Sequence, residues 1–147
     1  MTLDRDLSSV QEVRDLIRAA KKAQAALSSL GQAEVDAIVR AMAEAAEQNA
    51  ERLAKMAVED TGFGVVADKI VKNRFASRTV HASIKDIRSI GIIREEAEKQ
   101  IVEAAVPVGV VAGLVPSTNP TSTTIFKALI AVKAGNAVVF SPHPAAV

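Results

Sequence analysis

Residues 109–144 read GVVAGLVPSTNPTSTTIFKALIAVKAGNAVVFSPHP, and this stretch decides the fold class. The β-branched, glycine-punctuated run at 108–115 predicts a strand. Residues 121–133 predict a helix, and a Gly-Asn turn and a short buried strand at 137–140 follow. Both strands are apolar along their length, which suits parallel strands covered on both faces. The pattern is therefore a strand, a helix and a parallel strand, the unit of a doubly wound, Rossmann-like α/β sheet.

Polar side chains fill the two turns that follow these strands. Ligands of doubly wound sheets bind beyond the carboxyl ends of the strands, where the sequence places PSTNPTST and SPHP. The first N–H groups of the helix near Thr121 also favour an anion. Ser, Thr and Asn are equally common as helix caps for local reasons, so a ligand site and simple capping both remain open. The usual dinucleotide fingerprint GxGxxG is absent.

The upstream half predicts helices. Ser9 and Glu12 have the spacing of a capping box at the start of a first helix, and Gly31 is expected to cap its end. Helical periodicity then covers 32–48 and 50–59. A fourth helix is expected from Val66 or Asp68 to about Arg88.

The composition changes near Gln100, where an extended segment at 100–106 is expected. We therefore divide the chain into a helical segment, 1–98, and the start of a cofactor-binding βαβ region, 99–147. The 147 residues fit one ordinary domain or part of a larger one.

Charge and composition exclude several classes of function. The net charge of +1 argues against a nucleic-acid partner and against a polybasic membrane anchor. The absence of cysteine excludes a disulfide framework, a thiolate metal site and a cysteine nucleophile within these residues. The first ten residues lack the apolar run of a secretory signal, and no stretch reaches the roughly 20 apolar residues of a membrane span. The expected location is the cytoplasm.

The βαβ stretch closely resembles the start of the cofactor domain in CoA-acylating aldehyde dehydrogenases. The nearest likeness is the aldehyde dehydrogenase half of bifunctional aldehyde–alcohol dehydrogenases. The PSTNPTST and SPHP turns and the upstream run DKIVKN match together, with their spacing, and the resemblance extends to the first helix. Such enzymes convert a short aldehyde, CoA and NAD⁺ into acyl-CoA and NADH, or run the reverse reaction. They attack the aldehyde with a cysteine thiolate, and preorganised donors stabilise the resulting oxyanion.

The resemblance implies a catalytic donor in the first turn. In the wider superfamily this turn reads P-W-N-F-P, and the Asn side chain is the donor. An ungapped count places Thr118 at the Asn position and Asn119 one residue later. Both are therefore candidate catalytic residues, and Asn119 is favoured because its amide N–H₂ reaches further.

The resemblance also implies a cofactor site across both turns. Its expected residues are Val115, Pro116, Ser117, Ser141, Pro142 and His143. The superfamily often has K-P-S-E at the second turn, where Lys and Glu hold the adenosine ribose. Ser141 and His143 can still bond a ribose hydroxyl, but without the Glu the choice between NAD and NADP is open.

Other polar residues are expected to be structural. Lys127 is expected to be a solvated helix residue, with a cofactor phosphate as the alternative. His81 is expected at the surface, and Glu59 and Asp60 at a helix end. The alternating charges of DKIVKN are expected to form a solvated helix face.

An enzyme of this type needs roughly three times this length, so the chain is expected to be an N-terminal part of one. It is then inactive alone, because the cysteine lies elsewhere. The expected partners are a small aldehyde, CoA and further copies in a homo-oligomer. The alternative is a non-catalytic helical interaction module whose terminal strands serve in assembly, since unpaired strand edges invite association.

Overall fold

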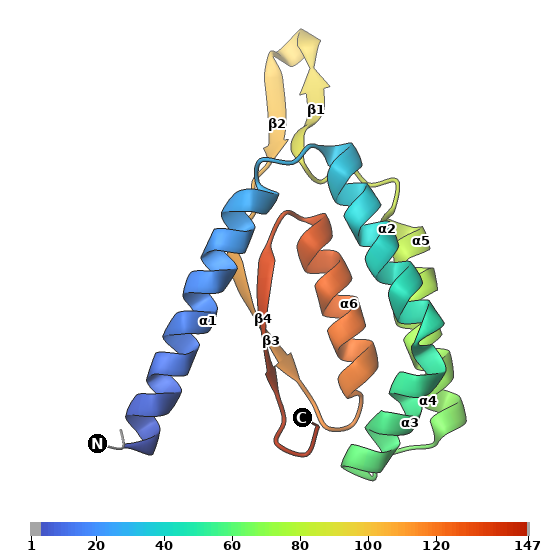
Figure 1. The fold of residues 1–147 in the computed structure, drawn as a ribbon. Coiled ribbons are helices and arrows are strands. Elements are labelled where there is room, and N and C mark those ends of the chain that lie inside the picture. Colours follow the sequence, from blue (N-terminus) through green and yellow to red (C-terminus); the bar gives the residue numbers. More distant parts are fainter. Residues whose placement is uncertain (1–3, 147) are drawn as a thin grey trace.

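The computed structural model describes residues 4–146, apart from the side chain of Arg5. Figure 1 shows the order of the elements along the chain, with helices first and the parallel strands last. The elements are α1 (Arg5–Leu27), α2 (Gln32–Gln48), α3 (Ala50–Thr61), α4 (Val66–Arg74), the π-helical η1 (Phe75–Thr79), α5 (Val80–Ile84), β1 (Gly91–Glu96), the 3₁₀ turn η2 (Ala97–Lys99), β2 (Ile101–Ala105), β3 (Val110–Val115), α6 (Pro120–Lys133) and β4 (Ala137–Pro142).

The predicted βαβ unit is confirmed. β3 and β4 pair in parallel, in a register that runs from Val110 opposite Ala137 to Val115 opposite Pro142. The two strands lie between α1 and α6 (Figure 1). The second strand was expected to stop at Phe140, but the ladder continues through Ser141 and Pro142.

Aliphatic side chains dominate the core around α6, as expected for a chain without Trp or Tyr. Leu129 of α6 is 1% exposed and packs with residues of α2 and α5. The fully buried members of this cluster are Val35, Val39, Ala43, Val80 and Leu129.

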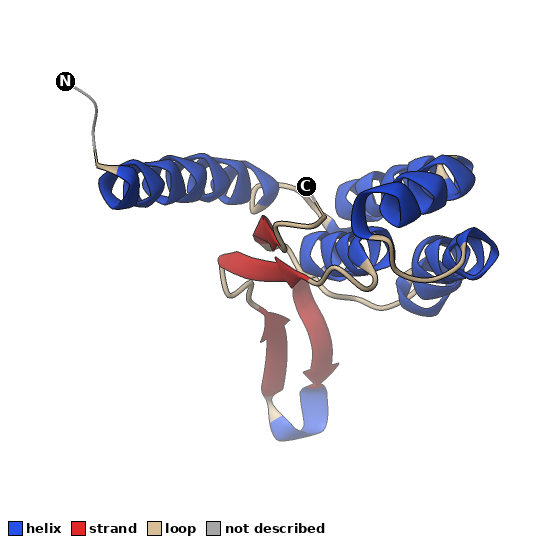
Figure 2. Cartoon of the chain, turned by 90° about the horizontal axis from the view of Figure 1, so that it is seen from below, coloured by secondary structure: helices blue, strands red, loops and turns tan. Residues whose placement is uncertain are grey.

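The prediction that helices extend to residue 98 is wrong. The helices end at Ile84, and β1 pairs with β2 in an antiparallel hairpin that projects from the body of the molecule (Figures 1 and 2). Cross-strand contacts explain the hairpin, since Arg94 forms ion pairs with Glu103 of the opposite strand and with Glu96. Opposite charges that face each other across two strands help to hold the pair together. The extended segment expected at 100–106 is confirmed in β2.

The predicted caps of the first helix are also wrong. α1 begins at Arg5, so Ser9 lies inside the helix, and α1 ends at Leu27. Gly31 has extended backbone geometry and precedes α2, where its N–H donates to Glu34 Oε2 over 2.9 Å. The Glu34 side chain therefore caps the start of the second helix, and Gly31, which has no side chain, returns no bond.

The fourth predicted helix is real but contains an unexpected turn. It runs from Val66 to Ile84 with the π-helical segment η1 in its middle. Ser77 Oγ, fully buried, donates to the Asn73 carbonyl over 2.8 Å and stabilises the wider turn. π turns of this kind occur often beside functional sites.

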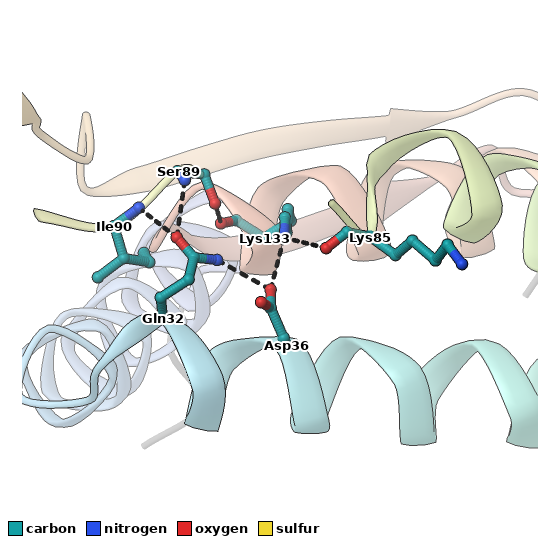
Figure 3. A network of polar contacts seen from close by, with 6 residues as sticks. All are labelled: Gln32, Asp36, Lys85, Ser89, Ile90 and Lys133. Atoms are coloured by element: carbon teal, nitrogen blue, oxygen red, sulfur yellow. Dashed lines mark hydrogen bonds and ion pairs between the residues drawn. The ribbon is translucent and has the colours of Figure 1, made fainter. Parts of the chain in front are cut away.

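A partly buried polar network holds the chain where it leaves the helices for the hairpin (Figure 3). Lys133 Nζ is 2.5 Å from Asp36 Oδ1 and 3.1 Å from the Lys85 carbonyl. Gln32 donates to the same Asp36 oxygen, and its own Oε1 accepts the backbone N–H groups of Ser89 and Ile90. α2, α6 and the segment before β1 are thereby tied together at one point. Within residues 4–146 no helix combines the length and apolarity needed to cross a membrane.

Candidate functional site

The two polar turns meet at one edge of the β3–β4 pair. The parallel register places Val115 opposite Pro142, and His143 N–H then donates to the Val115 carbonyl over 2.9 Å. The expected cofactor residues of both turns therefore begin side by side. His143 Nδ1 accepts the N–H of Ala145 over 3.1 Å, so the imidazole also stabilises its own turn.

A cavity of about 300 Å³ lies beside this edge, between the start of α6, the end of β4 and α3. It is mostly apolar, with two threonine hydroxyls from the first turn of α6. Its lining is Leu53, Val115, Pro120, Thr121, Thr124, Ile125, Phe140, Pro142 and Ala146.

Ser141 lies on the opposite side of the sheet from Pro142. It lines a separate cavity of about 750 Å³ between α1 and the strands. Successive residues of a strand point to opposite faces, so one turn cannot bring both side chains to the same cavity. Pro116 and Ser117 lie in the first turn, where Pro116 is exposed and Ser117 half-buried.

Asn119 occupies the N-cap position of α6 without capping it through its side chain. The Asn119 carbonyl accepts the first helical bond, from Thr123 N–H over 3.2 Å. Pro120 follows at the first helical position, where its missing N–H costs nothing. The local alternative of side-chain capping is thus not realised at Asn119.

Three side chains of α4 hold the turn instead. Lys69 Nζ donates to the Thr118 carbonyl over 2.8 Å, and Lys72 Nζ donates to Asn119 Oδ1 over 3.0 Å. Thr121 Oγ1 donates to Asn73 Oδ1 over 2.8 Å, while Asn73 Nδ2 donates to the Ala50 carbonyl. The turn and the start of α6 are therefore fixed by an element nearly fifty residues earlier in the chain.

The expectation that DKIVKN is a solvated face is wrong for two of its residues. Lys69 is 4% exposed and Asn73 is fully buried. Sequence reasoning missed this anchoring role, although a signal was present. Lys69, Lys72 and Asn73 have the i, i+3, i+4 spacing that places side chains on one face of a helix.

The surroundings of Lys69 change its protonation. Burial, and then the neighbouring charge of Lys72, lower the pKa of Lys69 from its ordinary value of 10.5. Gly64 allows the close passage of this side chain, since a Cβ there would lie 3.3 Å from Lys69 Cε. Its φ of +79° also favours glycine.

A groove of about 490 Å³ runs between α4–η1 and α6, and Asn119 is among its lining residues. Its apolar wall consists of Val71, Phe75, Ala76, Val80 and Phe126. Its polar residues are Lys72, Asn119, Ser122 and Thr123. Thr118 does not line this groove, so of the two candidate donors the groove adjoins Asn119.

The remaining singled-out residues have structural surroundings. Lys127 Nζ donates to the Leu114 carbonyl of β3 over 2.5 Å, in an exposed position. His81 is half-buried on α5. Among residues 4–146, no three His, Asp or Glu side chains are grouped closely enough to hold a metal ion.

Comparison with known proteins gives matches along nearly the whole chain. Residues 4–147 match the model of the aldehyde dehydrogenase family. The bifunctional aldehyde-alcohol dehydrogenase AdhE of Escherichia coli K12 is 45% identical over 140 residues, which cover 95% of this chain and 16% of AdhE.

Two solved structures extend the comparison. An acetylating aldehyde dehydrogenase from Geobacillus thermoglucosidasius is 59% identical, with a TM-score of 0.95 over 99% of this chain and 32% of its own. A Rhodopseudomonas palustris propionaldehyde dehydrogenase solved with bound CoA is 28% identical, with a TM-score of 0.72 over 90% of this chain and 30% of its own.

This chain spans about a third of the length of these solved structures and a smaller share of AdhE. Within that span the helices, the βαβ unit and the sequence agree together. The chain belongs to the aldehyde dehydrogenase family, in its acylating branch.

Proposed function

We propose that these residues supply the oxyanion donor and one wall of the aldehyde site of a cytoplasmic CoA-acylating, NAD(P)-dependent aldehyde dehydrogenase. The observation that carries the proposal is the presence of Asn119 in the lining of a largely apolar groove. Its Oδ1 is held by Lys72, and among residues 4–146 no acceptor is recorded for its Nδ2. An amide N–H₂ in this position can donate to the oxygen of an aldehyde.

In the proposed reaction the groove holds the carbon chain of the aldehyde. Its wall offers the carbon chain an apolar surface to pack against. When a thiolate adds to the carbonyl carbon, negative charge develops on the aldehyde oxygen, and Asn119 Nδ2 donates to that oxygen. The 147 residues contain no cysteine, so the thiolate must come from residues other than these.

The cavity beside Val115 and Pro142 is the proposed place of the nicotinamide cofactor. Its apolar lining fits a flat ring, and it lies beyond the carboxyl ends of both strands. When bound, the cofactor supplies hydride transfer. Thr121 and Thr124 each donate within the chain, to Asn73 and to the Pro120 carbonyl, and retain oxygen lone pairs for a ligand.

A chimera tests this function. Residues 1–147 replace the matching 32% of the Geobacillus enzyme, which is similar enough in backbone for the exchange. We expect CoA-dependent NADH formation from acetaldehyde by the chimera and none by the 147-residue chain alone. Asn119→Ala should lower kcat of the chimera about 10²- to 10³-fold, since a missing oxyanion donor costs this much.

The matched control is Thr118→Val, outside the groove, which should change kcat far less. A chimera that folds and turns over equally well with Asn119→Ala would contradict the proposal. Titration of the unmodified chain with NAD separates the proposed function from a non-catalytic interaction module, which would not bind NAD.

The β1–β2 hairpin is the proposed place of self-association. Ile92, Ile101 and Val102 are 44%, 46% and 60% exposed on a two-stranded arm with free edges. Such edges pair readily with another chain. Native mass measurements should show an oligomer that Val102→Lys weakens, and a wild-type monomer would contradict this part.

A further inference from the structure

We propose that Lys72 is a positioning residue: it holds the side-chain amide of Asn119 so that Nδ2 faces the groove. The inference rests on the proposed function, because it concerns the donor of that same site. Its evidence is the 3.0 Å contact from Lys72 Nζ to Asn119 Oδ1 and the place of both residues in the groove lining.

The chemistry of the two groups permits only one orientation. An ammonium group donates and never accepts, whereas an Asn amide has an accepting end, Oδ1, and a donating end, Nδ2. The end that faces Lys72 must therefore be Oδ1. A flipped amide would direct its N–H groups at a positive charge and lose a charge-assisted hydrogen bond, which is stronger than a neutral one.

No other recorded contact selects this orientation within residues 4–146. The Asn119 side chain does not cap α6, and no acceptor is recorded for its Nδ2. Lys72, in turn, forms no recorded ion pair with a described carboxylate. Lys72 is exposed, and among the described residues the contact with Asn119 is the hydrogen bond recorded for its ammonium group.

The neighbouring anchors act on different atoms of the turn. Lys69 binds the Thr118 carbonyl, and Asn73 accepts the Thr121 hydroxyl, so both fix the backbone and the helix start. Lys72 alone among them contacts the amide. Its charge also polarises the amide, because hydrogen bonds in series strengthen one another, and Nδ2 becomes a better donor.

Nuclear magnetic resonance on the 147-residue chain tests the orientation directly. In the wild type we expect the Asn119 side-chain N–H₂ group to give one pair of proton signals, as an ordered amide does. Lys72→Met should disorder that amide while the backbone amides of residues 117–123 keep their order. Lys72→Arg, which retains a donor, should preserve the ordered amide. An Asn119 amide equally ordered with Lys72→Met would overturn the proposal.

Kinetics of the chimera test the consequence for catalysis. Lys72→Met should lower kcat about tenfold with little change in the aldehyde KM, since a misplaced group costs rate rather than binding. Lys72→Arg should restore most of the loss. Lys72→Met combined with Asn119→Ala should be no slower than Asn119→Ala alone, because both changes remove one function. Lys55→Met, an exposed lysine of α3, is the unaffected control.

The outcomes separate the two proposals. If Asn119→Ala lowers kcat and Lys72→Met does not, the role of Lys72 is wrong and the proposed function stands. A double variant whose loss of kcat equals the product of the two single losses would also overturn the role of Lys72. If Asn119→Ala is without effect, the donor itself is wrong, and the inference falls with it.

Discussion

Lys69 extends from α4 to the carbonyl oxygen of Thr118 with 4% of its surface exposed. Burial of an ammonium group is costly unless it is bonded, and here the bond is to a neutral carbonyl. The result is a lysine whose protonated form is less favourable in the folded protein than in the unfolded chain. This difference has a measurable consequence for stability.

We predict that Lys69 makes the protein more stable as the pH rises toward 10.5. Burial and Lys72 lower its folded pKa below 10.5, so between the two values the unfolded chain binds more protons. The free energy of unfolding of the wild type, relative to Lys69→Met, should therefore increase through that interval. Urea unfolding of both proteins at a series of pH values measures it.

Lys55 provides a control of opposite sign. Its hydrogen bond and charge pairing with Glu51 raise the pKa of Lys55 above 10.5. Its contribution to the free energy of unfolding is therefore present below pH 10.5 and is lost at higher pH. A Lys69→Met difference that stays flat, or falls with pH as for Lys55, would contradict the assignment.

Lys133 is the second buried lysine, and it has a carboxylate partner. Its side chain is 5% exposed, whereas that of Asp36 is 35% exposed. Lys133→Met should lower the free energy of unfolding by about 3 kcal/mol, the lower end for a broken buried pair, because Asp36 keeps some contact with water. Chemical denaturation measures the loss. Adding Asp36→Leu should recover part of it, and a loss as small as that of exposed Lys55→Met would contradict the prediction.

At the scale of elements, short connections decide how the βαβ unit meets the helices. α6 ends at Lys133, and Gly135 turns the chain into β4 with a φ of +73°. Asn136 Oδ1 accepts the N–H of Gly109 over 2.9 Å, which links this turn to the start of β3. The turn thus aligns both strands at their amino ends, and the carboxyl ends meet as a consequence.

Gly135→Ala should destabilise the protein by about 1–2 kcal/mol. An L-residue pays this in left-handed geometry, and the new Cβ would lie 3.2 Å from Ile90 Cδ1. Gly31→Ala is the matched control, because its φ of −82° is ordinary and the nearest atom would be 3.7 Å away. It should change stability by less than about 0.5 kcal/mol. Thermal unfolding of the two variants compares them, and equal shifts would refute the turn argument.

At the scale of the whole molecule, packing is uneven. α6 is enclosed by α2, α3, α4 and the strands, whereas α1 contacts the sheet over only part of its length. Of the apolar residues on α1, Ala20 is buried, while Leu7, Val10, Val13, Leu16 and Ile17 are 38–54% exposed. The stability of the chain therefore comes from the side of the sheet that carries α6.

A pair of identical substitutions tests this distribution. Leu129→Ala in α6 should cost about 2–5 kcal/mol, because it leaves a cavity in the core. Leu7→Ala in α1, where the leucine is 54% exposed, should change stability by no more than about 0.5 kcal/mol. Urea unfolding gives both values, and similar costs at the two positions would contradict the uneven packing described above.

The sequence alone determined the elements that local periodicity encodes. Apolar spacing and turn residues along the chain predict the bounds of α2, the helix over 121–133 and the parallel strands. Motif spacing indicates the family. The candidate donor Asn119 also came from a motif, and it remains a proposal. Strand residues 91–96 were included in the helical segment because the change to strand composition was placed only near Gln100.

The tertiary structure decided which side chains converge. Lys69 and Thr118 are 49 residues apart in sequence, and Lys72 and Asn119 are 47 apart. A helix pattern gives the face that a lysine occupies but not what packs against that face. Likewise, the alternation of β4 separates Ser141 from Pro142 only once the two faces of the sheet are known. Contacts that arise from packing between distant elements have no local signature, so the groove beside Asn119 emerges only from the folded chain.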